Sequence, residues 1–344
     1  MFRFRILALC LAVLMLVSGC SQKPVVEKEP EVAVQPEPEP VVDPETLEIQ
    51  EFMKKYIDSD ERPIAVMVDN DDKNARPHAG LSDAYLIYEM VVEGGATRFM
   101  ALFKGVDTEK IGPVRSSRHY FLDYVMENGA VYTHFGWSPK ASSDISAFGI
   151  EKINGVLGGD GDIFWREEKF KGDWHSAYTS IKNIKDMATK KGFSDVTDRK
   201  NGIEYSDKYF DITSGTAASD ISLKYSYGYT TGYTYNAQKK LYEKTILGAP
   251  HVMQSGETLE VKNIIIAYVS DVALGDGTER RNLLNTGSGK GYYITNGMCE
   301  EITWTKSDRK ENTVYKKSDG SDLKINPGKT IVNLISPTAT VTIN

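Results

Sequence analysis

The apolar N-terminus constrains the fold more than any other part of the sequence. Residues 6–17 form the one long apolar stretch among the 344 residues. Two arginines precede this stretch, and Val-Ser-Gly leads from it to Cys20. A transmembrane helix needs about 20 apolar residues, so the stretch is too short to span a bilayer. We expect residues 1–19 to be a signal peptide ending in a lipobox, with Cys20 as the lipidated residue. An ordinary secretory leader is the alternative.

Residues 20–48 are expected to form a tether between this anchor and a folded body. The segment is rich in Pro and Glu and contains no aromatic residue. Proline favours extended polyproline II structure and the acidic charges repel one another, which indicates a semi-rigid spacer. The sequence therefore predicts a protein held at the cell membrane on its extracytoplasmic side, with its body at a distance from the lipid.

The charge balance excludes one class of partner. Residues 21–48 carry eight acidic residues and two lysines, which leaves 37 basic and 40 acidic residues in 49–344. A nucleic-acid-binding protein usually concentrates basic residues on one surface to displace counterions from phosphates. The nearly neutral body shows no such excess, so we expect no nucleic-acid partner.

The first part of the body shows a strand and a hairpin. The apolar run at 64–68 predicts a buried strand that places Asp69 at its end. Two apolar runs on either side of a Gly-Gly pair, within 84–103, predict a β-hairpin. A two-residue turn would place Glu89, Glu93 and Arg98 on the same face of the hairpin, whereas a three-residue turn would move Arg98 away from the glutamates.

Two arginines are expected to flank the start of the next helix. Ser116 or Ser117 would be the N-cap of a helix that ends near Gly129, so Arg115 and Arg118 would lie beside the positive end of its dipole. This position is unfavourable for cations unless an anion lies between them. That anion is either a carboxylate from the hairpin or a carboxylate or phosphate of a ligand.

Further along, helical spacing predicts helices over 46–57 and 181–191, the second capped by Thr179 or Ser180. After residue 200 the short alternating runs are typical of antiparallel β-structure. We expect Tyr225, Tyr227 and Tyr229 to share one face of a strand, 263–270 to be a buried strand, and 329–335 to be the last strand. The predicted fold class is α+β, with a mixed α/β domain over 49–200 and a mainly antiparallel β domain over 201–344.

Four segments resemble the YerB-like bacterial lipoproteins, a family catalogued as a domain of unknown function. They are RPIAVMVDN at 62–70, ARPHAGLSDA at 75–84, YEMVVEGGATRFMALF at 88–103 and KIGPVRSSRHYF at 110–121. The similarity extends over about 62–337. It implies a lipoprotein with two domains and brings no established reaction. The chain departs from the family pattern at Trp137 and around His175, where Asp173-Trp174 precedes the histidine.

Three functions remain open at this point. A binding module for an anionic envelope ligand, such as a cell-wall peptide or glycan, would use Arg76, Arg98, Arg115, Arg118, Glu89 and Glu93. A hydrolase or transferase acting on the wall would draw its acid, base or proton-transfer groups from Asp69, Glu89, Glu93, His134 and His175. A scaffold or regulator would use the charges only as a structural network. The sequence predicts no cofactor and no metal site, and it does not indicate a protein partner.

Overall fold

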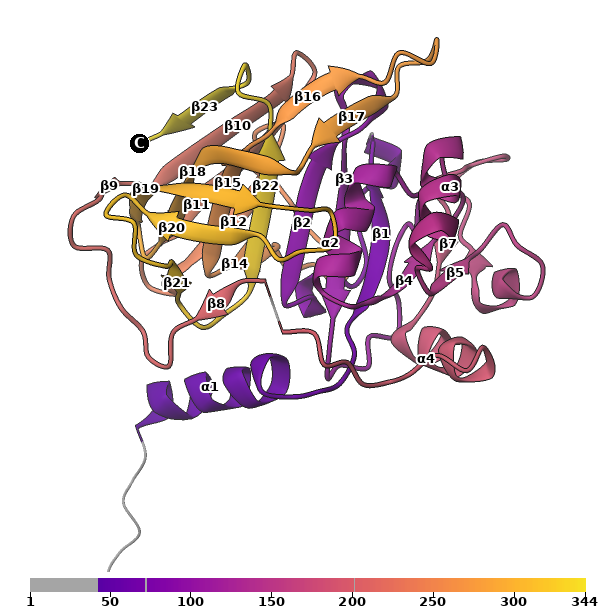
Figure 1. The fold of residues 1–344 in the computed structure, drawn as a ribbon, viewed down its shortest axis with the longest axis horizontal. Coiled ribbons are helices and arrows are strands. Elements are labelled where there is room, and N and C mark those ends of the chain that lie inside the picture. Colours follow the sequence, from indigo (N-terminus) through magenta and orange to yellow (C-terminus); the bar gives the residue numbers. More distant parts are fainter. Residues whose placement is uncertain (1–42, 72, 201) are drawn as a thin grey trace, which may run out of the picture. The chain divides into compact units, whose positions relative to one another are not determined.

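An eleven-stranded mixed sheet forms the centre of the structure, a computed structural model that describes residues 43–344 except 72 and 201 (Figure 1). The strand order is β20-β19-β18-β15-β22-β2-β3-β1-β4-β5, with β9 paired to β19. The strands are β1 (Ile64–Asn70), β2 (Leu86–Val91), β3 (Thr97–Phe103), β4 (Val131–His134), β5 (Lys152–Asn154), β9 (Thr216–Ala217), β15 (Asn263–Tyr268), β18 (Gly287–Thr295), β19 (Met298–Lys306), β20 (Val314–Lys317) and β22 (Thr330–Ile335). The predicted signal peptide, Cys20 and most of the tether lie outside the described residues.

The two halves of the chain meet inside this sheet. Strand β22, from the C-terminal half, pairs in parallel with β2 on one side and with β15 on the other. Parallel strands are connected by long crossovers rather than by tight turns, so the neighbours of β22 in the sheet lie far from it in the sequence. Strands from both predicted domains therefore belong to one hydrogen-bonded sheet. The predicted domain boundaries themselves stay a prediction.

A smaller antiparallel sheet belongs to the C-terminal half. Its strand order is β13-β12-β11-β10-β23, with β14 paired to β12. Its strands are β10 (Asp220–Ser226), β11 (Tyr229–Asn236), β12 (Leu241–Ile246), β13 (Ala249–Pro250), β14 (Glu260–Val261) and β23 (Thr340–Ile343). Three two-stranded ribbons complete the β-structure: β6 (Trp165–Arg166) with β7 (Ala177–Tyr178), β8 (Glu204–Tyr205) with β21 (Lys324–Ile325), and β16 (Ser270–Ala273) with β17 (Arg281–Leu284). The predicted α+β class is confirmed.

Four α-helices are described: α1 (Pro44–Phe52), which continues as a π-helical turn over Met53–Ile57, α2 (Leu122–Glu127), α3 (Pro139–Phe148) and α4 (Ile181–Lys190). The predicted cap of α4 is confirmed, since the Ser180 hydroxyl accepts a hydrogen bond from the Asn183 N–H. Among the described residues, no helix has the length and apolar character needed to cross a membrane.

Both faces of strands β1, β2 and β3 in the central sheet are buried. On one face, apolar residues of β1–β3 pack with Leu122 and Val125 of α2 and Ile145 of α3. On the other face they pack with Ile184 of α4 and with Tyr233 and other residues of the smaller sheet. Because side chains alternate along a strand, each of β1, β2 and β3 contributes to both cores. Any charged residue on these strands is therefore buried and needs a partner.

The predicted hairpin forms with the three-residue turn, so the face expected to be shared by Glu89, Glu93 and Arg98 is wrong. Val92 N–H donates to Ala96 O at 2.8 Å, so Glu93, Gly94 and Gly95 form a three-residue turn. Both glycines have positive φ, 68° and 76°, a conformation that glycine adopts without a steric penalty. The turn shifts the register by one residue, so Arg98 lies opposite Met90, and Glu89 lies opposite Phe99. A one-residue shift reverses the face of every side chain, and Glu89 and Arg98 therefore point to opposite cores.

Two other expectations differ from the structure. The strand predicted to carry Tyr225, Tyr227 and Tyr229 is interrupted at residues 227–228, which connect β10 to β11 as a hairpin turn. Tyr227 is consequently 98% exposed, whereas Tyr229 is buried with its ring against that of Tyr225, so the expected face of three tyrosines does not form. The strand predicted over 329–335 exists as β22, but β23 follows it. The strands predicted at 64–68 and 263–270 are confirmed as β1 and β15.

Candidate functional site

Asp69 is the centre of a polar cluster on the face of the sheet that carries Arg98. Asp69 and Arg98 are direct cross-strand partners in β1 and β3, and Arg98 Nε lies 3.7 Å from Asp69 Oδ1. Arg115 Nε lies 2.9 Å from the other carboxylate oxygen, Oδ2. The Asp69 side chain has no exposed surface. We call Asp69, Glu93, Arg98, Arg115, Arg118 and His175 the arginine–carboxylate cluster.

Asp69 stays ionised despite its burial. Burial raises the pKa of a carboxyl group, but the hydrogen bond from His175 and the positive charges of Arg98 and Arg115 outweigh it, and the pKa of Asp69 lies below its ordinary value. Burial lowers the pKa of the Arg98 guanidinium to about 10, so Arg98 remains charged at neutral pH. Arg98 Nη1 also donates to Ser116 O at 2.8 Å. The buried end of the cluster is therefore an ionised carboxylate held between two guanidinium groups.

The outer end of the cluster is a pair between the hairpin turn and the segment before α2. Arg118 donates to both oxygens of Glu93, from Nε at 2.6 Å and from Nη2 at 2.8 Å. This two-pronged geometry is the strongest contact a guanidinium makes with a carboxylate. The pKa of Glu93 lies below its ordinary value because the hydrogen bond and charge of Arg118 outweigh the effect of burial. The anion beside Arg118 is thus the hairpin carboxylate.

The predicted helix start near these arginines is wrong. Neither Ser116 nor Ser117 caps α2, which begins at Leu122 after a 3-10 turn over His119–Phe121 and has no side-chain cap. The segment before it runs extended, and Ser117 N–H donates to Gly136 O in a short bridge to the loop after β4. Arg115 and Arg118 are consequently positioned by an extended segment rather than by a helix dipole.

His175 connects Asp69 to the surface. Its Nδ1 lies 2.7 Å from Asp69 Oδ2, and its Nε2 accepts a hydrogen bond from the indole N–H of Trp174 at 2.6 Å. A ring nitrogen that accepts carries no proton, so the proton lies on Nδ1 and is donated to Asp69. Asp173 fixes this loop, because its Oδ1 accepts the His175 backbone N–H at 2.9 Å. The imidazole therefore has a defined tautomer and orientation.

Arg115 is the most exposed arginine of the cluster and has spare hydrogen-bonding capacity. Its side chain is 22% exposed, and its guanidinium carbon lies 5.6 Å from the ring centre of Trp174, a residue that is 64% exposed. Its one ionic contact with the described residues uses Nε. Among the residues that the structure describes, no acceptor hydrogen-bonds to its Nη1 or Nη2. Two donors in a planar fork thus lie beside an exposed aromatic ring.

Two predicted ligand-binding residues lie on the opposite face of the sheet. Glu89 and Lys244 form an ion pair at 2.9 Å in which neither side chain has exposed surface. The hydroxyls of Thr97 and Thr231 also donate to Glu89. Arg76 is half-buried and its Nη1 donates to Asn70 Oδ1 at 3.3 Å, on the Glu89 side. We call Glu89 and Lys244 the sealed pair, since the cores enclose both charges.

The structure also separates His134 from the cluster. His134 is fully buried, its Nδ1 lies 2.7 Å from Gly136 O, and its ring packs against Tyr132 and Trp137. Burial lowers its pKa to about 4, so it is neutral near pH 7. Among the described residues there is no group of three or more His, Cys, Asp or Glu side chains arranged to hold a metal ion.

Sequence reasoning named Asp69, Glu93, Arg98, Arg115, Arg118 and His175, but it paired them differently. It assigned both hairpin glutamates to the arginines, whereas Glu89 belongs to the sealed pair. It also did not predict the contact between Trp174 and Arg115. The departure from the family pattern at Asp173-Trp174 was the signal that pointed to this loop.

Comparisons with known proteins agree with the fold. Two family models match the chain: the N-terminal domain of the protein of unknown function DUF3048 over residues 53–194, and the C-terminal domain of the same family over 221–332. The crystal structure of the YerB protein from Bacillus subtilis superposes with a TM-score of 0.72 at 29% sequence identity. It covers 82% of this chain and 94% of that one.

A sequence relative extends the match. YerB of Bacillus subtilis (strain 168), whose name classes it with the lipoproteins, is 31% identical over 283 residues, which is 80% of this chain and 82% of YerB. The expected resemblance is therefore confirmed. The chain belongs to the DUF3048 family of YerB-like proteins.

Proposed function

We propose that this protein is a lipoprotein anchored through Cys20 on the extracytoplasmic side of the cell membrane, and that its arginine–carboxylate cluster binds an anionic ligand of the envelope. The leader that ends in Val-Ser-Gly-Cys supports the anchor, as does the name of the Bacillus subtilis relative. The Pro- and Glu-rich segment after Cys20 would let the body reach ligands away from the lipid surface.

The single observation that carries the binding role is the state of Arg115. Asp69 holds its Nε, and the two Nη groups have no acceptor among the described residues. A guanidinium held in this way loses little conformational entropy on binding, and its parallel N–H groups match the two oxygens of a carboxylate. The ligand's carboxylate would bind at these Nη groups, where the side chain reaches solvent.

Trp174 narrows the class of ligand. Its exposed ring lies beside the Arg115 guanidinium and offers a flat apolar surface next to the charge. Aromatic faces pack well on the C–H groups of sugars and peptides while neighbouring polar groups bind their oxygens. A cell-wall peptide or glycan that carries carboxylates combines both features, and we propose it as the ligand.

The test is the retention of the full chain on purified wall material. We expect Arg115→Ala to reduce retention by about tenfold or more, as for the loss of a charged hydrogen-bonding contact. Arg281→Ala is the matched control, because Arg281 is also partly exposed and paired with one carboxylate, Asp271, and neither residue belongs to the cluster. Equal retention of both variants and the wild type, with each variant folded by circular dichroism, would contradict the proposal.

A second candidate function has one observation in its favour. The hydrogen bond between His175 Nδ1 and Asp69 resembles the contact that orients a general base. In that case Nε2 would take a proton from a bound substrate after Trp174 releases it. An acid–base role predicts soluble fragments released from wall material by the wild type and a loss of that release in His175→Gln. Binding without any release favours the first function.

A further inference from the structure

Strand β23 is an edge strand of the smaller sheet. It ends the strand order of the smaller sheet, with β10 as its one neighbour among the described strands. Its sequence over 340–343 is Thr-Val-Thr-Ile. Natural proteins usually guard such edges with lysine, proline or a β-bulge, because free backbone groups template the pairing of another strand. This β-branched segment carries none of these features.

The register shows which backbone groups of β23 are free. Asn344 and Asp220 exchange both backbone hydrogen bonds, at 2.9 and 3.0 Å. Antiparallel pairs alternate, so in the continuing register Thr342 and Thr340 face β10, and Ile343 and Val341 turn their N–H and C=O groups away. No described backbone group hydrogen-bonds to Val341 or Ile343 from the open side. The edge therefore presents two N–H and two C=O groups.

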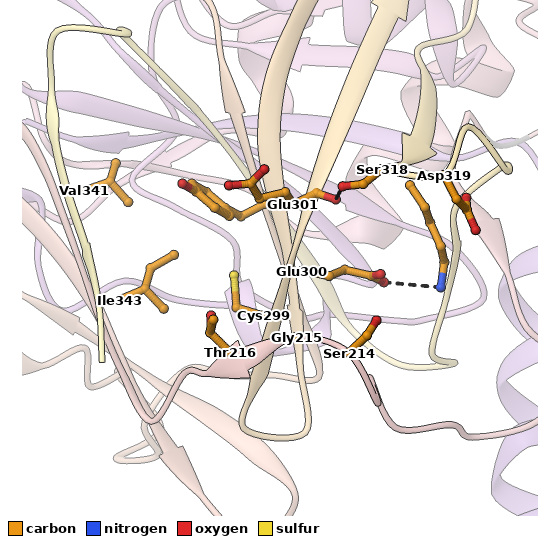
Figure 2. A pocket seen from close by; sticks show the side chains of 12 residues that line it. Ser214, Gly215, Thr216, Cys299, Glu300, Glu301, Ser318, Asp319, Val341 and Ile343 are labelled. Carbon is orange, nitrogen blue, oxygen red and sulfur yellow. Dashed lines mark hydrogen bonds and ion pairs between the residues drawn. The ribbon is translucent and has the colours of Figure 1, made fainter.

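A groove of about 750 Å³ lies beside this edge. Figure 2 shows the Val341 and Ile343 side chains on one side of the hollow, with Cys299 and Glu301 of β19 across from them. Burial together with the charges of Glu300 and Glu301 raises the pKa of the Cys299 thiol to about 12. The thiol is therefore protonated and acts as an apolar wall, not as a nucleophile. The groove offers room for alternate side chains of a strand that pairs with β23.

The groove is negatively charged. Glu300, Glu301 and Asp319 line it together with one cation, Lys317, whose Nζ lies 3.4 Å from Glu300 Oε1. Two acidic groups are left without an ion-pair partner among the described residues. A segment with lysine or arginine at alternate positions would complement this charge. The chain's own Pro- and Glu-rich segment and a second copy of this acidic edge would both bring like charges.

We propose that β23 and its groove bind an extended, basic peptide segment of a partner protein, which adds as a strand to the smaller sheet. Main-chain hydrogen bonds to Val341 and Ile343 would provide affinity, and basic side chains lying over Glu301 and Asp319 would provide selectivity. This surface is formed by strands other than those of the arginine–carboxylate cluster, so the proposal stands independently of the wall-binding function.

The probe is a fluorescein-labelled peptide, Thr-Lys-Thr-Lys-Thr-Lys-Thr, titrated into the full chain and followed by fluorescence anisotropy. Its acidic twin replaces every lysine with glutamate. Two further twins carry N-methyl groups, one on the lysines and one on the inner threonines. Because N–H groups alternate along a strand, we expect one N-methylated twin to lose affinity by about tenfold or more and the other to bind much as the parent does.

Variants of the protein test the same contacts from the other side. We expect Val341→Pro, which removes one outward N–H, to weaken binding by about tenfold, and Val341→Ala, which keeps it, to bind almost normally. Glu301→Gln should weaken binding and reduce its salt dependence, whereas Glu279→Gln, at an exposed site outside the groove, should not.

Several results would overturn the proposal: no saturable binding, equal affinity for the acidic twin, or equal affinity for both N-methylated twins and the parent. If Val341→Pro fails to fold, the N-methylated peptides decide the question on the wild-type chain. Sedimentation that shows dimers in the wild type and none in Val341→Pro would make a second copy the occupant, and the peptide proposal would fail.

Discussion

The two faces of strands β1–β3 hold their charges in different ways. On one face Glu89 meets Lys244 with both side chains fully enclosed, and the buried rings of His78 and His251 lie nearby around Phe99. On the other face Asp69 is equally buried, but its partners lead through Arg115 and His175 to the surface at Trp174. The difference indicates that burial of a carboxylate does not by itself point to a function. A buried carboxylate whose partners reach the surface and have free hydrogen-bond donors there is the better candidate for a binding site.

The sealed pair should be the most costly to break. Lys244→Met leaves the Glu89 carboxylate buried without its cation, and removal of one partner of a buried pair typically costs about 3–5 kcal/mol. Burial already lowers the pKa of Lys244 although Glu89 opposes the shift. We expect the free energy of unfolding, measured with urea, to fall by that amount while wall retention of the remaining folded protein is unchanged.

The double variant Glu89→Gln with Lys244→Met sharpens this result. Replacing both charges removes the unpaired ion, so we expect it to recover most of the stability lost in Lys244→Met. A double variant that is no more stable than the single one, or a loss of retention in either variant, would show that the two faces do not differ as described.

The histidines of the enclosed face should give a pH dependence of stability. Burial lowers the pKa of His78 to about 3 from an ordinary value of 6.5, and that of His251 well below 6.5. Below pH 6.5 the unfolded chain takes up protons that the folded chain cannot bind, so stability is present above pH 6.5 and is lost as the pH falls. Each such histidine adds up to about 1.4 kcal/mol per pH unit to this slope.

His78→Gln should therefore reduce the slope of unfolding free energy against pH between 6.5 and 4.5. This window lies above the pKa of Asp69, so the Asp69 carboxylate stays ionised throughout it. His134 and His251 remain and keep part of the slope. Identical slopes for the wild type and His78→Gln would mean that His78 is protonated in the folded protein.

The outer pair of the cluster should have the smallest effect on stability. Glu93 and Arg118 are partly exposed, so solvent screens their charges and we expect the pair to contribute about 1 kcal/mol, less than the sealed pair. Glu93→Gln releases the Arg118 guanidinium, so we expect slightly tighter wall retention together with a small change in the melting temperature. Weaker retention would indicate instead that Glu93 contacts the ligand.

Local patterns predicted the elements of the fold well. The apolar runs found β1 and β15, and the Ser180 cap found the start of α4. The register of the hairpin could not be predicted, because two adjacent glycines permit a two- or a three-residue turn with little difference in energy. That single residue decides which face receives Arg98.

The partners within the site were beyond sequence reasoning for a different reason. Asp69 and His175 are 106 residues apart, and Glu89 and Lys244 are 155 apart. Their meeting depends on how β22 and the smaller sheet assemble against β1–β3, and no local periodicity encodes that assembly. The sequence did not reveal that Lys244 pairs with Glu89, so both hairpin glutamates were equally suitable partners for the arginines.

The central claim is that Arg115 offers its two Nη groups to a carboxylate. Isothermal titration of the full chain with a soluble wall peptide bearing a free C-terminal carboxylate, and with the same peptide as its C-terminal amide, tests this directly. Arg115→Lys keeps a cation beside Asp69 but removes the planar fork. The account predicts that the amide, and the acid with Arg115→Lys, each bind at least about tenfold more weakly than the acid with the wild type. Equal Kd values for acid and amide, or an unchanged Kd in Arg115→Lys, would contradict it.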